Sequence, residues 1–567
     1  MSKFESSFSV LNRNSQIQQL KSETFDLVVI GGGATGTGIA LDASSRGLKT
    51  ALVEKRDFAS GTSSKSTKLI HGGLRYLKQL DIALVRETGT ERAVVHKLAP
   101  HLVLPEKMLM PLIKGGTYGK WATSFGLWVY DILAGVSGDD KRKMLSRKKT
   151  LELEPLLGKD GLKGGGYYAE YRTDDARLTI ELIKTAASYG TIALNYCKVT
   201  NFEYSDKNVS GVLCKDQLTG ENFVIKAKNV VSAGGPWVDK IRKKDGKVEG
   251  KRLHLTKGVH IVFPHEKFPL KHTTYFDAPD GRMIFAIPRG RVTYVGTTDT
   301  TYKASLNRVV STKEDAKYLL GVTSRVFPDI TLKESDIISN WAGLRPLIHE
   351  DGKSPSELSR KDEIFISDNG LISIAGGKLT GYRKMGQRIV DIVIKRMEKA
   401  TRKEFAKCFT KKIPLTKNPL ANAKAVQNYI QSLEKIVLEK GLEKYHAWYL
   451  VTNYGQQADT ILALMESYSD APEIALARAE ASFGIHHEMI ASAADFFVRR
   501  TGRLYFDINS ISIIRQAVMN DFQEFLSWDD ERMNHENKKM DELLYDATHY
   551  YEKELEDNIE ETIVETS

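Results

Sequence analysis

A glycine motif near the N-terminus constrains the fold more than any other feature of the sequence. Phe25–Ile30 is an apolar run apart from Asp26, and the turn Gly31-x-Gly33-x-x-Gly36 follows it before a helical stretch. A second apolar run ends at Glu54. The three glycines permit a tight turn, close approach to a pyrophosphate, and close packing of helix on strand. The pattern predicts a Rossmann-like βαβ unit that binds a dinucleotide, with Glu54 accepting hydrogen bonds from the adenosine ribose.

Proteins that bind FAD and proteins that bind NAD(P) share this glycine motif. Three later segments of the chain favour FAD. Gly61–Tyr76 is dense in hydroxyl groups and glycine, as suits hydrogen bonds to a flavin and its phosphates. Val230–Lys240 and Ile372–Lys384 each begin as an apolar strand that ends in two glycines. A helix that begins after the second pair could stabilise a reduced flavin through its positive end. Three such segments converging on one ligand predict a large, buried FAD.

The periodicity of the chain predicts an α/β protein with an additional α+β substrate domain and a helical C-terminal domain. Several segments between residues 100 and 370 alternate with period two, which indicates an antiparallel sheet beside the nucleotide domain. A basic linker with prolines, Lys411–Asn418, then leads into amphipathic helices.

The resulting domain assignment is an N-terminal extension over 1–24, interleaved FAD-binding and substrate-binding domains over 25–412, a helical domain over 413–530 and an acidic tail over 531–567. Within the interleaved part, the FAD domain takes about 25–100, 165–240 and 340–400, and the substrate domain takes about 100–165 and 240–340.

Charge and cysteine content exclude several protein classes. The net charge is +10, from 82 Lys+Arg and 72 Asp+Glu; residues 531–567 carry −8, so the rest carries +18. A composition with 41% hydrophobic residues excludes a disordered, a collagen-like and a disulfide-scaffold chain. Cys197, Cys214 and Cys408 show no metal-ligand spacing, so we expect no metal and a reduced intracellular protein. We see neither a membrane span nor a secretory signal.

Several longer stretches together resemble the FAD-dependent glycerol-3-phosphate dehydrogenases. The stretches are "DLVVIGGGATGTGIALDASSRG", "GTSSKSTKLIHGGLRYLKQLD", "LAPHLVLP", "DDARL", "GGPWVDK", "TKGVHIVFP", "VGTTDT", "WAGLRPL" and "AGGKLTGYRKM". They run from about residue 24 to 390. The resemblance implies bound FAD, oxidation of sn-glycerol 3-phosphate to dihydroxyacetone phosphate, hydride transfer to the flavin, and electron transfer to a membrane quinone.

Candidate site residues follow from the motifs and the resemblance. We expect FAD to contact Gly31, Gly33, Ala34, Thr35, Gly36, Glu54, Thr62, Ser63, Ser64, Lys68, Leu69, His71, Gly72, Val199, Ala233, Gly234, Trp237, Gly377, Lys378, Leu379 and Thr380. We expect the substrate to contact Arg75, Tyr76, Arg345, Arg360 and Lys378, because a phosphate dianion needs cationic and hydroxyl partners.

The reaction also needs a base for the substrate hydroxyl. His260, in the alternating strand "TKGVHIVF", and His71, between the hydroxyl-rich loop and two glycines, are both candidates. We favour His260, with Arg345 polarising the substrate oxygen.

The electron acceptor separates two branches of the resembling family. An oxidase branch that makes hydrogen peroxide carries a long insertion between the "LRPL" and "AGGK" motifs. Only 28 residues separate Leu347 from Gly376 here, which favours the dehydrogenase. Flavoproteins that act on amines or amino acids share the fold but lack the phosphate-directed arginines. An RNA-modifying flavoprotein is a further alternative, suggested by the net charge of +18 outside the acidic tail, which would have to bind the RNA.

The resemblance implies a cytoplasmic protein held peripherally on the inner face of the cell membrane. Lys141–Lys149 and Lys395–Lys412 are basic segments that suit anionic headgroups, and the second includes Met397, Phe405 and Phe409. We expect no nucleic-acid partner, and the sequence allows a homodimer.

Overall fold

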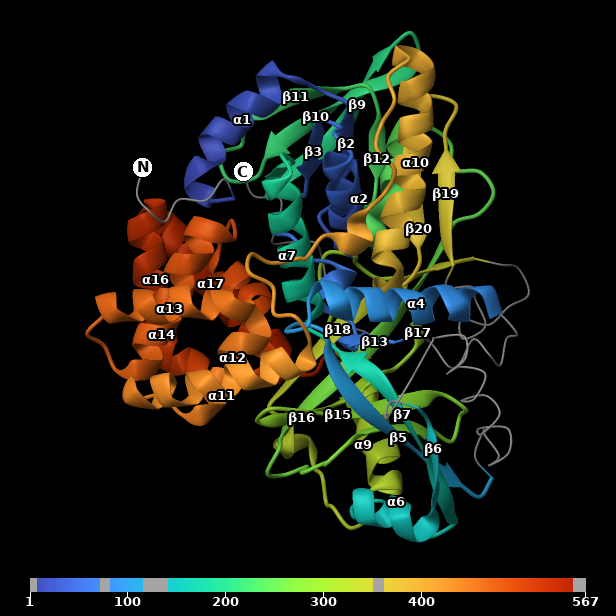
Figure 1. The fold of residues 1–567 in the computed structure, drawn as a ribbon, viewed down its shortest axis with the longest axis vertical. Coiled ribbons are helices and arrows are strands. Elements are labelled where there is room, and N and C mark those ends of the chain that lie inside the picture. Colours follow the sequence, from blue (N-terminus) through green and yellow to red (C-terminus); the bar gives the residue numbers. More distant parts are fainter. Residues whose placement is uncertain (1–7, 72–81, 116–140, 350–360, 554–567) are drawn as a thin grey trace.

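The computed structural model describes residues 8–71, 82–115, 141–349 and 361–553, and the structural statements below concern these ranges. Figure 1 shows a layered α/β part, a large sheet below it, and a helical domain packed on one side. No helix among the described ranges combines the length and apolar character that crossing a membrane requires.

The α/β part is built on a six-stranded sheet in the order β19-β20-β12-β2-β3-β8. Its strands are β2 Leu27–Ile30, β3 Thr50–Val53, β8 Ile192–Leu194, β12 Val230–Ser232, β20 Ile372–Gly376 and the antiparallel edge strand β19 Asp362–Ile366. The other pairings are parallel. Helices α2 (Ala34–Ser45), α7 (Asp175–Ser188) and α10 (Tyr382–Thr401) pack beside one another against it, and every residue of the central strands β2, β3 and β12 is buried.

A smaller sheet extends the α/β part and involves the N-terminus. Its strands are β1 Thr24–Phe25, β9 Cys197–Ser205, β10 Asn208–Asp216 and β11 Asn222–Ala227. Helix α1 (Arg13–Ser22) buries Ile17 and Leu20. Arg13 donates to Asp216 at 2.5 Å. The segment expected as a polar extension is therefore an integrated helix, because its sparse apolar residues and one arginine all face inward.

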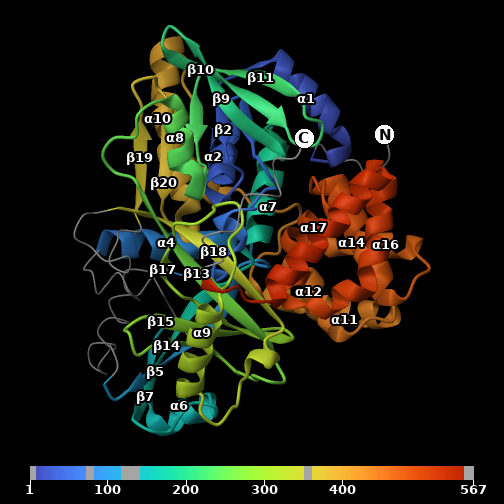
Figure 2. The same cartoon turned by 180° about the vertical axis from the view of Figure 1, so that it is seen from behind.

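The lower part is a ten-stranded sheet that is mostly antiparallel. Its strands are β4 Leu69–Ile70, β5 Leu104–Ile113, β6 Lys143–Ser146, β7 Leu162–Arg172, β13 Leu253–Pro264, β14 Thr273–Asp277, β15 Met283–Arg289, β16 Val292–Gly296, β17 Thr300–Thr301 and β18 Ser339–Ile348. Helix α9 (Lys313–Val326) covers this sheet, as Figure 2 shows from behind. Helices α4 (Ile82–Leu98), α6 (Arg147–Leu153) and α8 (Val238–Asp245) complete these two parts.

Two predicted domain limits differ from the structure. Most of β7 and nearly all of β18 fall in ranges assigned to the FAD domain, yet both strands pair within the lower sheet. β18 pairs with β13 over ten residues, from Leu253↔Ile348 to Val262↔Ser339. Alternation along one strand cannot show which sheet the strand joins, because the pairing partner lies elsewhere in the chain.

The helical domain begins after a linker that follows α10. Its helices are α11 Ala423–Glu439, α12 Lys444–Tyr454, α13 Ala458–Leu464, α14 Pro472–His487, α15 Arg503–Phe506, α16 Ile508–Leu526 and α17 Asp530–Thr548. A π-helix, η10, spans Asp495–Arg500 between α14 and α15.

Up to Thr548, the segment predicted to be an acidic tail forms helix α17, and this helix packs against the body. Glu536 and Met540 are buried, and α17 packs on β18. Beyond the buried face, Asp546 accepts from Arg308 at 2.7 Å. Basic residues of the body therefore pair with acids of this segment, so opposite charges dock it. Residues 554–567 lie outside the described ranges.

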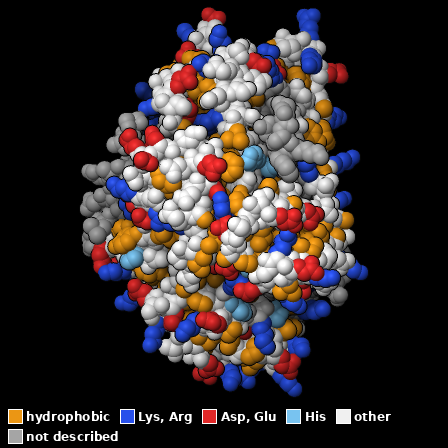
Figure 3. Space-filling model, turned by 90° about the vertical axis from the view of Figure 1, so that its left-hand side faces the viewer, with side chains coloured by type: hydrophobic (Ala, Val, Ile, Leu, Met, Phe, Trp, Pro, Cys, Tyr) orange, Lys and Arg blue, Asp and Glu red, His pale blue; other side chains and the backbone are white. Residues whose placement is uncertain are grey.

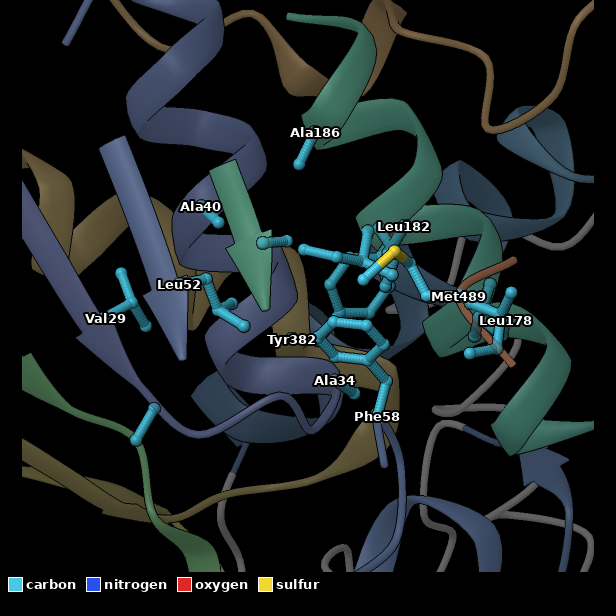
Figure 4. Close-up of a cluster of buried hydrophobic side chains, with 14 of the residues drawn as sticks. Val29, Ala34, Ala40, Leu52, Phe58, Leu178, Leu182, Ala186, Tyr382 and Met489 are labelled. Carbon is cyan, nitrogen blue, oxygen red and sulfur yellow. The ribbon is translucent and has the colours of Figure 1, made fainter. Parts of the chain in front are cut away.

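One core joins the helical domain to the α/β part. Figure 4 shows Met489, which follows α14, beside Leu178 and Leu182 of α7, while Phe58 and Tyr382 pack near Ala34. The domain interface thus contains a shared apolar core, and burial on this scale favours a fixed arrangement of the two parts.

Candidate active site

The glycine turn folds as the sequence predicts. Gly31 has φ +113°, and a Cβ there would lie 2.6 Å from the Ala233 carbonyl oxygen. A Cβ at Gly36 would lie 1.9 Å from the Gly31 carbonyl oxygen. Gly33 is the N-cap of α2 and adds no side-chain cap. The turn therefore needs its glycines for steric reasons, and it leaves the positive end of α2 facing the space in front of it.

Glu54 supports the turn from the end of β3. Its Oε2 accepts from the Gly32 N–H at 2.7 Å, and its Oε1 accepts from the Arg56 N–H at 3.0 Å. Glu54 also lines the cavity described next. Its carboxylate thus holds the backbone of the turn and borders the space where a ribose would lie.

A cavity of about 460 Å3 opens in front of the turn. Its walls include the ends of β2 and β3, the Ala233–Trp237 stretch after β12, and the Gly376–Thr380 stretch after β20. These are carboxyl ends of neighbouring strands in one sheet, the edge where open α/β sheets bind ligands. The far wall comes from β18 of the lower sheet, including Arg345. The cavity therefore bridges the two sheets.

Most predicted cofactor residues line this cavity. They are Gly31, Gly33, Ala34, Thr35, Glu54, Thr62, Ser63, Leu69, His71, Val199, Ala233, Gly234, Trp237, Gly377, Lys378, Leu379 and Thr380. Gly36, Ser64 and Lys68 do not line it. Gly72 lies outside the described residues.

Lys68 has a structural environment instead. Its buried Nζ lies 2.5 Å from Asp175 Oδ1 and donates to the Ser64 carbonyl oxygen at 3.1 Å. Asp174 is 3.6 Å away. The ammonium thus ties the hydroxyl-rich loop to the start of α7, behind the cavity. The loop composition could not distinguish this role from contact with a ligand.

Sequence reasoning missed a group of basic residues around the cavity. They are Lys55, Arg56, Lys65, Lys198, Lys240 and Lys244. Burial, with Arg56 close by, lowers the pKa of Lys55 to about 7, and burial likewise lowers the pKa of Lys65 to about 8. Lys55 and Arg56 directly follow Glu54, and Lys65 lies in the hydroxyl-rich loop, so the positions of these three could have been read from the sequence. The others come from β9 and α8, which lie far away in the chain.

These features fit FAD. Lys55 Nζ lies 3.8 Å from the centroid of the Trp237 ring, so cation and ring together border the cavity. Trp237 Nε1 is buried without a hydrogen-bond partner among the described residues. Crowded cations and the N-terminus of α2 favour a polyanion, and an unpaired indole N–H favours a ligand with acceptor atoms. A dinucleotide with a pyrophosphate and a large ring system meets both demands.

Arg345 is held at the far wall by the loop after β16. Its guanidinium donates to Thr297 Oγ1 at 2.6 Å, to the Thr298 carbonyl oxygen at 2.9 Å and to Asp299 Oδ1 at 3.2 Å. A Cβ at Gly258 would lie 2.3 Å from Arg345 Nη2, so this glycine makes room for the guanidinium. The fork is therefore preoriented toward the cavity, as recognition of a planar or tetrahedral anion requires.

His260 lies behind the cavity wall. Its ring stacks on Trp341 with centroids 4.6 Å apart, and its Nε2 is 3.0 Å from Thr67 Oγ1. Thr67, which the sequence analysis did not single out, lines the cavity. Burial, helped by Arg345 and Lys68, holds the pKa of His260 well below its usual range. The imidazole is therefore neutral, and it reaches the cavity through the Thr67 hydroxyl.

His71 and Lys378 form part of the wall itself. The His71 carbonyl oxygen accepts from Thr380 Oγ1 at 3.2 Å, which joins the hydroxyl-rich loop to the turn after β20. The His71 ring lies edge-on to Phe285, 6.1 Å between centroids. Of the two predicted bases, His71 is the one that borders the cavity. Arg75, Tyr76 and Arg360 lie outside the described residues.

Two family models match this chain. The family described as FAD dependent oxidoreductase matches residues 26–383. The family described as the C-terminal domain of alpha-glycerophosphate oxidase matches residues 408–533. The first range contains the glycine turn and the cavity, and the second contains most of the helical domain.

Relatives resemble the chain over nearly its whole length. It is 50% identical to the aerobic glycerol-3-phosphate dehydrogenase of Bacillus subtilis (strain 168) over 546 residues, which is 95% of this chain and 98% of that protein. It is 48% identical to that of Staphylococcus haemolyticus, with the same coverage. A solved structure, the glycerol-3-phosphate dehydrogenase from Bacillus halodurans complexed with FAD, is 42% identical with a TM-score of 0.81, covering 96% of this chain and 99% of that one.

Proposed function

Because this chain belongs to the FAD-dependent oxidoreductases, and within them to the aerobic glycerol-3-phosphate dehydrogenases, we propose the following account of its activity. FAD is its cofactor, and it oxidises sn-glycerol 3-phosphate to dihydroxyacetone phosphate. The observation that carries this function is one cavity that joins the glycine turn to Arg345 and Lys378. The turn end fits a dinucleotide, and the far end offers cations to a phosphorylated substrate.

Binding and orientation come from the residues of the far wall. When bound, FAD supplies the acceptor for the two electrons removed from the substrate carbon. Arg345, fixed by Thr297 and Asp299, offers a preoriented fork to an anionic substrate. Lys378 adds a point charge from the turn after β20. Fixing these groups beforehand lowers the entropy cost of holding the alcohol carbon in a reactive position.

The geometry of the cavity also distinguishes the two histidines that could accept the proton of the substrate hydroxyl. His71 borders the cavity directly, whereas His260 reaches it through Thr67. Burial, followed by the charges of Arg345 and Lys68, lowers the pKa of His260 and so disfavours a second proton on its ring. We therefore assign proton acceptance from the substrate hydroxyl to His71, and we assign to His260 the orientation of the Thr67 hydroxyl. This reverses the preference drawn from the sequence.

The function is tested by an anaerobic titration of the purified holoenzyme with glycerol 3-phosphate. Flavin absorbance should bleach at one equivalent of substrate per flavin. Glycerol, which lacks the phosphate, should bleach it far more slowly. Equal rates with the two substrates would contradict the phosphate assignment, and a purified protein without flavin absorbance would contradict the cofactor.

For the electron acceptor we propose a membrane quinone, with the protein held at the inner face of the cell membrane. The support is the short segment between Leu347 and Gly376 together with two exposed basic stretches. Both α10 and β6 lie away from the helical domain (Figures 1 and 2). By contrast, acidic and basic side chains intermingle on the face of the molecule that Figure 3 shows. A basic surface favours an anionic leaflet, whereas a mixed one does not.

The apolar residues of the second basic stretch do not take part in this contact. Met397 is buried, and Phe405 and Phe409 pack against the core. Arg396 donates to the Gly370 carbonyl oxygen at 2.8 Å, so it has a structural partner. The bases that remain exposed to meet headgroups are Lys395, Lys399, Arg402, Lys403, Lys407, Lys411 and Lys412. The proposed attachment is electrostatic rather than insertive.

Vesicle binding tests this attachment. Changing Lys395, Lys399, Arg402 and Lys403 to glutamine should weaken sedimentation with anionic vesicles and leave turnover with a soluble dye unchanged. The matched control changes four exposed lysines of the helical domain, Lys424, Lys435, Lys444 and Lys538, and should bind like the parent. Binding should fall as salt rises, since charges are screened beyond about 8 Å at physiological ionic strength. Rapid peroxide formation in air with no gain from a quinone analogue would favour the oxidase.

A further inference from the structure

The loop that follows β3 has two sides with different partners. Residues 53–56 and 60–63 line the cavity, but Asp57, Phe58 and Ala59 do not. These three residues are buried and face the opposite way. The loop therefore offers its two ends to the cofactor and its middle to the rest of the protein.

The middle of the loop abuts the glycine turn. The Ala59 N–H donates to the Gly32 carbonyl oxygen at 3.0 Å. A Cβ at Gly32 would lie 2.6 Å from Phe58 Cδ1, so the Phe58 ring fills the space beneath the turn. Figure 4 shows this ring near Ala34, the first residue of α2. Any shift of Asp57–Ala59 would consequently move the turn.

Asp57 is anchored by the C-terminal helical domain. Its buried carboxylate accepts from Arg499 Nε at 2.5 Å and from Arg500 Nη1 and Nη2 at 2.7 and 2.9 Å. It also accepts from Asn195 Nδ2 at 3.1 Å. Although burial opposes ionisation, Arg500 and Arg499 hold the pKa of Asp57 at about 2. We call Asp57, Asn195, Arg499 and Arg500 the Asp57 clamp.

The helical domain fixes the two arginines in turn. They are the last two residues of the π-helix η10, whose wider turn lets consecutive side chains reach one carboxylate. Arg500 donates to the Glu488 carbonyl oxygen, and Arg499 donates to Asp495. Glu536 of α17 accepts from the Ala493 N–H at 3.0 Å, just before the π-helix. Contacts from the segment after α14 and from α17 therefore hold the arginines of the clamp in place.

From this arrangement we infer that the C-terminal helical domain sets the affinity for FAD from outside the FAD site. Arg499 and Arg500 are positioning residues: they touch neither cofactor nor substrate, but through Asp57 they fix the loop and the glycine turn that line the cavity. FAD affinity thus depends on residues of a domain that contributes nothing to the cavity wall among the described residues. The inference rests on FAD as the cofactor and is independent of the substrate and acceptor.

The test measures FAD dissociation from three single variants of the full chain. Arg499→Gln removes one arm of the clamp, and Arg499→Lys keeps the charge. The matched control is Arg478→Gln: Arg478 pairs with Asp470 and Asp521 inside the helical domain, away from the loop. The flavin is removed from each variant, and FAD is then titrated into the apoprotein while flavin fluorescence reports the bound fraction. Circular dichroism checks that each apoprotein is folded.

We expect Arg499→Gln to weaken FAD binding about tenfold, comparable to the loss of one charge-assisted hydrogen bond. Arg499→Lys should recover most of the affinity, and the FAD-saturated variants should keep the parent kcat. Arg478→Gln should lower apoprotein stability and leave FAD affinity unchanged. An unchanged FAD affinity in Arg499→Gln, or an equal loss in Arg478→Gln, would overturn the inference. A parent that binds FAD but is not reduced by glycerol 3-phosphate would instead refute the proposed function alone.

Discussion

The glycine turn and the Asp57 clamp support the same cavity by opposite means. The turn lies within residues 31–36 and works through backbone contacts that a Cβ at Gly31 or Gly36 would break. The clamp joins residues up to 443 positions apart and works through buried charges. A steric demand for glycine is visible in a short stretch of sequence, because few other residues satisfy it. The partner of a buried charge cannot be read from the sequence in this way, because any arginine can pair with any aspartate once the fold brings them together.

The largest expected effect breaks the turn. In Gly36→Ala the new Cβ would lie 1.9 Å from the Gly31 carbonyl oxygen, and neither backbone can move without opening the turn. We expect a protein that purifies without flavin, measured as the ratio of flavin to protein absorbance. Gly321→Ala in α9 is the control, because nothing lies within 4 Å of its Cβ. A flavin-replete Gly36→Ala protein would mean that the turn is not steric in origin.

The next largest effect is expected on the free energy of unfolding, when a buried ion pair in the domain interface beside the Asp57 clamp is removed. Arg177 is buried and donates to Glu488 at 2.7 and 2.9 Å and to Glu181 at 3.1 Å. Without Arg177, the buried carboxylates of Glu181 and Glu488 would share the ammonium of Lys184, which leaves one negative charge in excess. Arg177→Gln should therefore cost about 3–5 kcal/mol in the free energy of unfolding.

Urea denaturation measures this loss. The control is Arg515→Gln, whose partner Asp541 is 67% exposed, and it should cost less than about 1 kcal/mol. Equal losses in the two variants would show that burial does not set the strength of these pairs.

Arg345 resembles the Asp57 clamp in that residues distant in the sequence hold its side chain, but it borders the cavity where we place the substrate. Arg345→Ala removes charge-assisted hydrogen bonds worth about 1.5–3 kcal/mol, which predicts a loss of about 10- to 150-fold in kcat/KM for glycerol 3-phosphate. Flavin content should stay at the parent level, and the slow rate with glycerol should not change. A parallel loss with glycerol would place Arg345 at the alcohol instead of the phosphate.

The smallest effect is a pH dependence of the clamp. The pKa of Asp57 is about 2 in the folded protein, against an ordinary value of 3.8. Its ionised form therefore stabilises the fold fully above about pH 4, and this contribution is lost as pH falls toward 2. The parent should exceed Asp57→Asn by about 2 kcal/mol in stability at pH 6, and the gap should close toward pH 2. A gap that is independent of pH would mean that the carboxylate charge does not matter.

Most of the cofactor end of the site could be predicted from the sequence. The turn, Glu54, and the glycines after β12 and β20 each follow a strand, so their places at one sheet edge follow from parallel pairing. The histidines could not be ranked in this way. His260 and Trp341 stack because β13 and β18 pair in one register, and that register put the ring behind Thr67.

The sequence by itself determined the nucleotide fold, the cofactor class and the order of the domains, because these depend on local sterics and on the period of apolar residues. Only the tertiary structure decided that α1 and α17 are integrated, that Lys68 pairs with Asp175, and that the helical domain anchors the cofactor loop. The physical reason is that a buried charge must find a partner, and the partner is chosen by which surfaces the whole fold brings into contact.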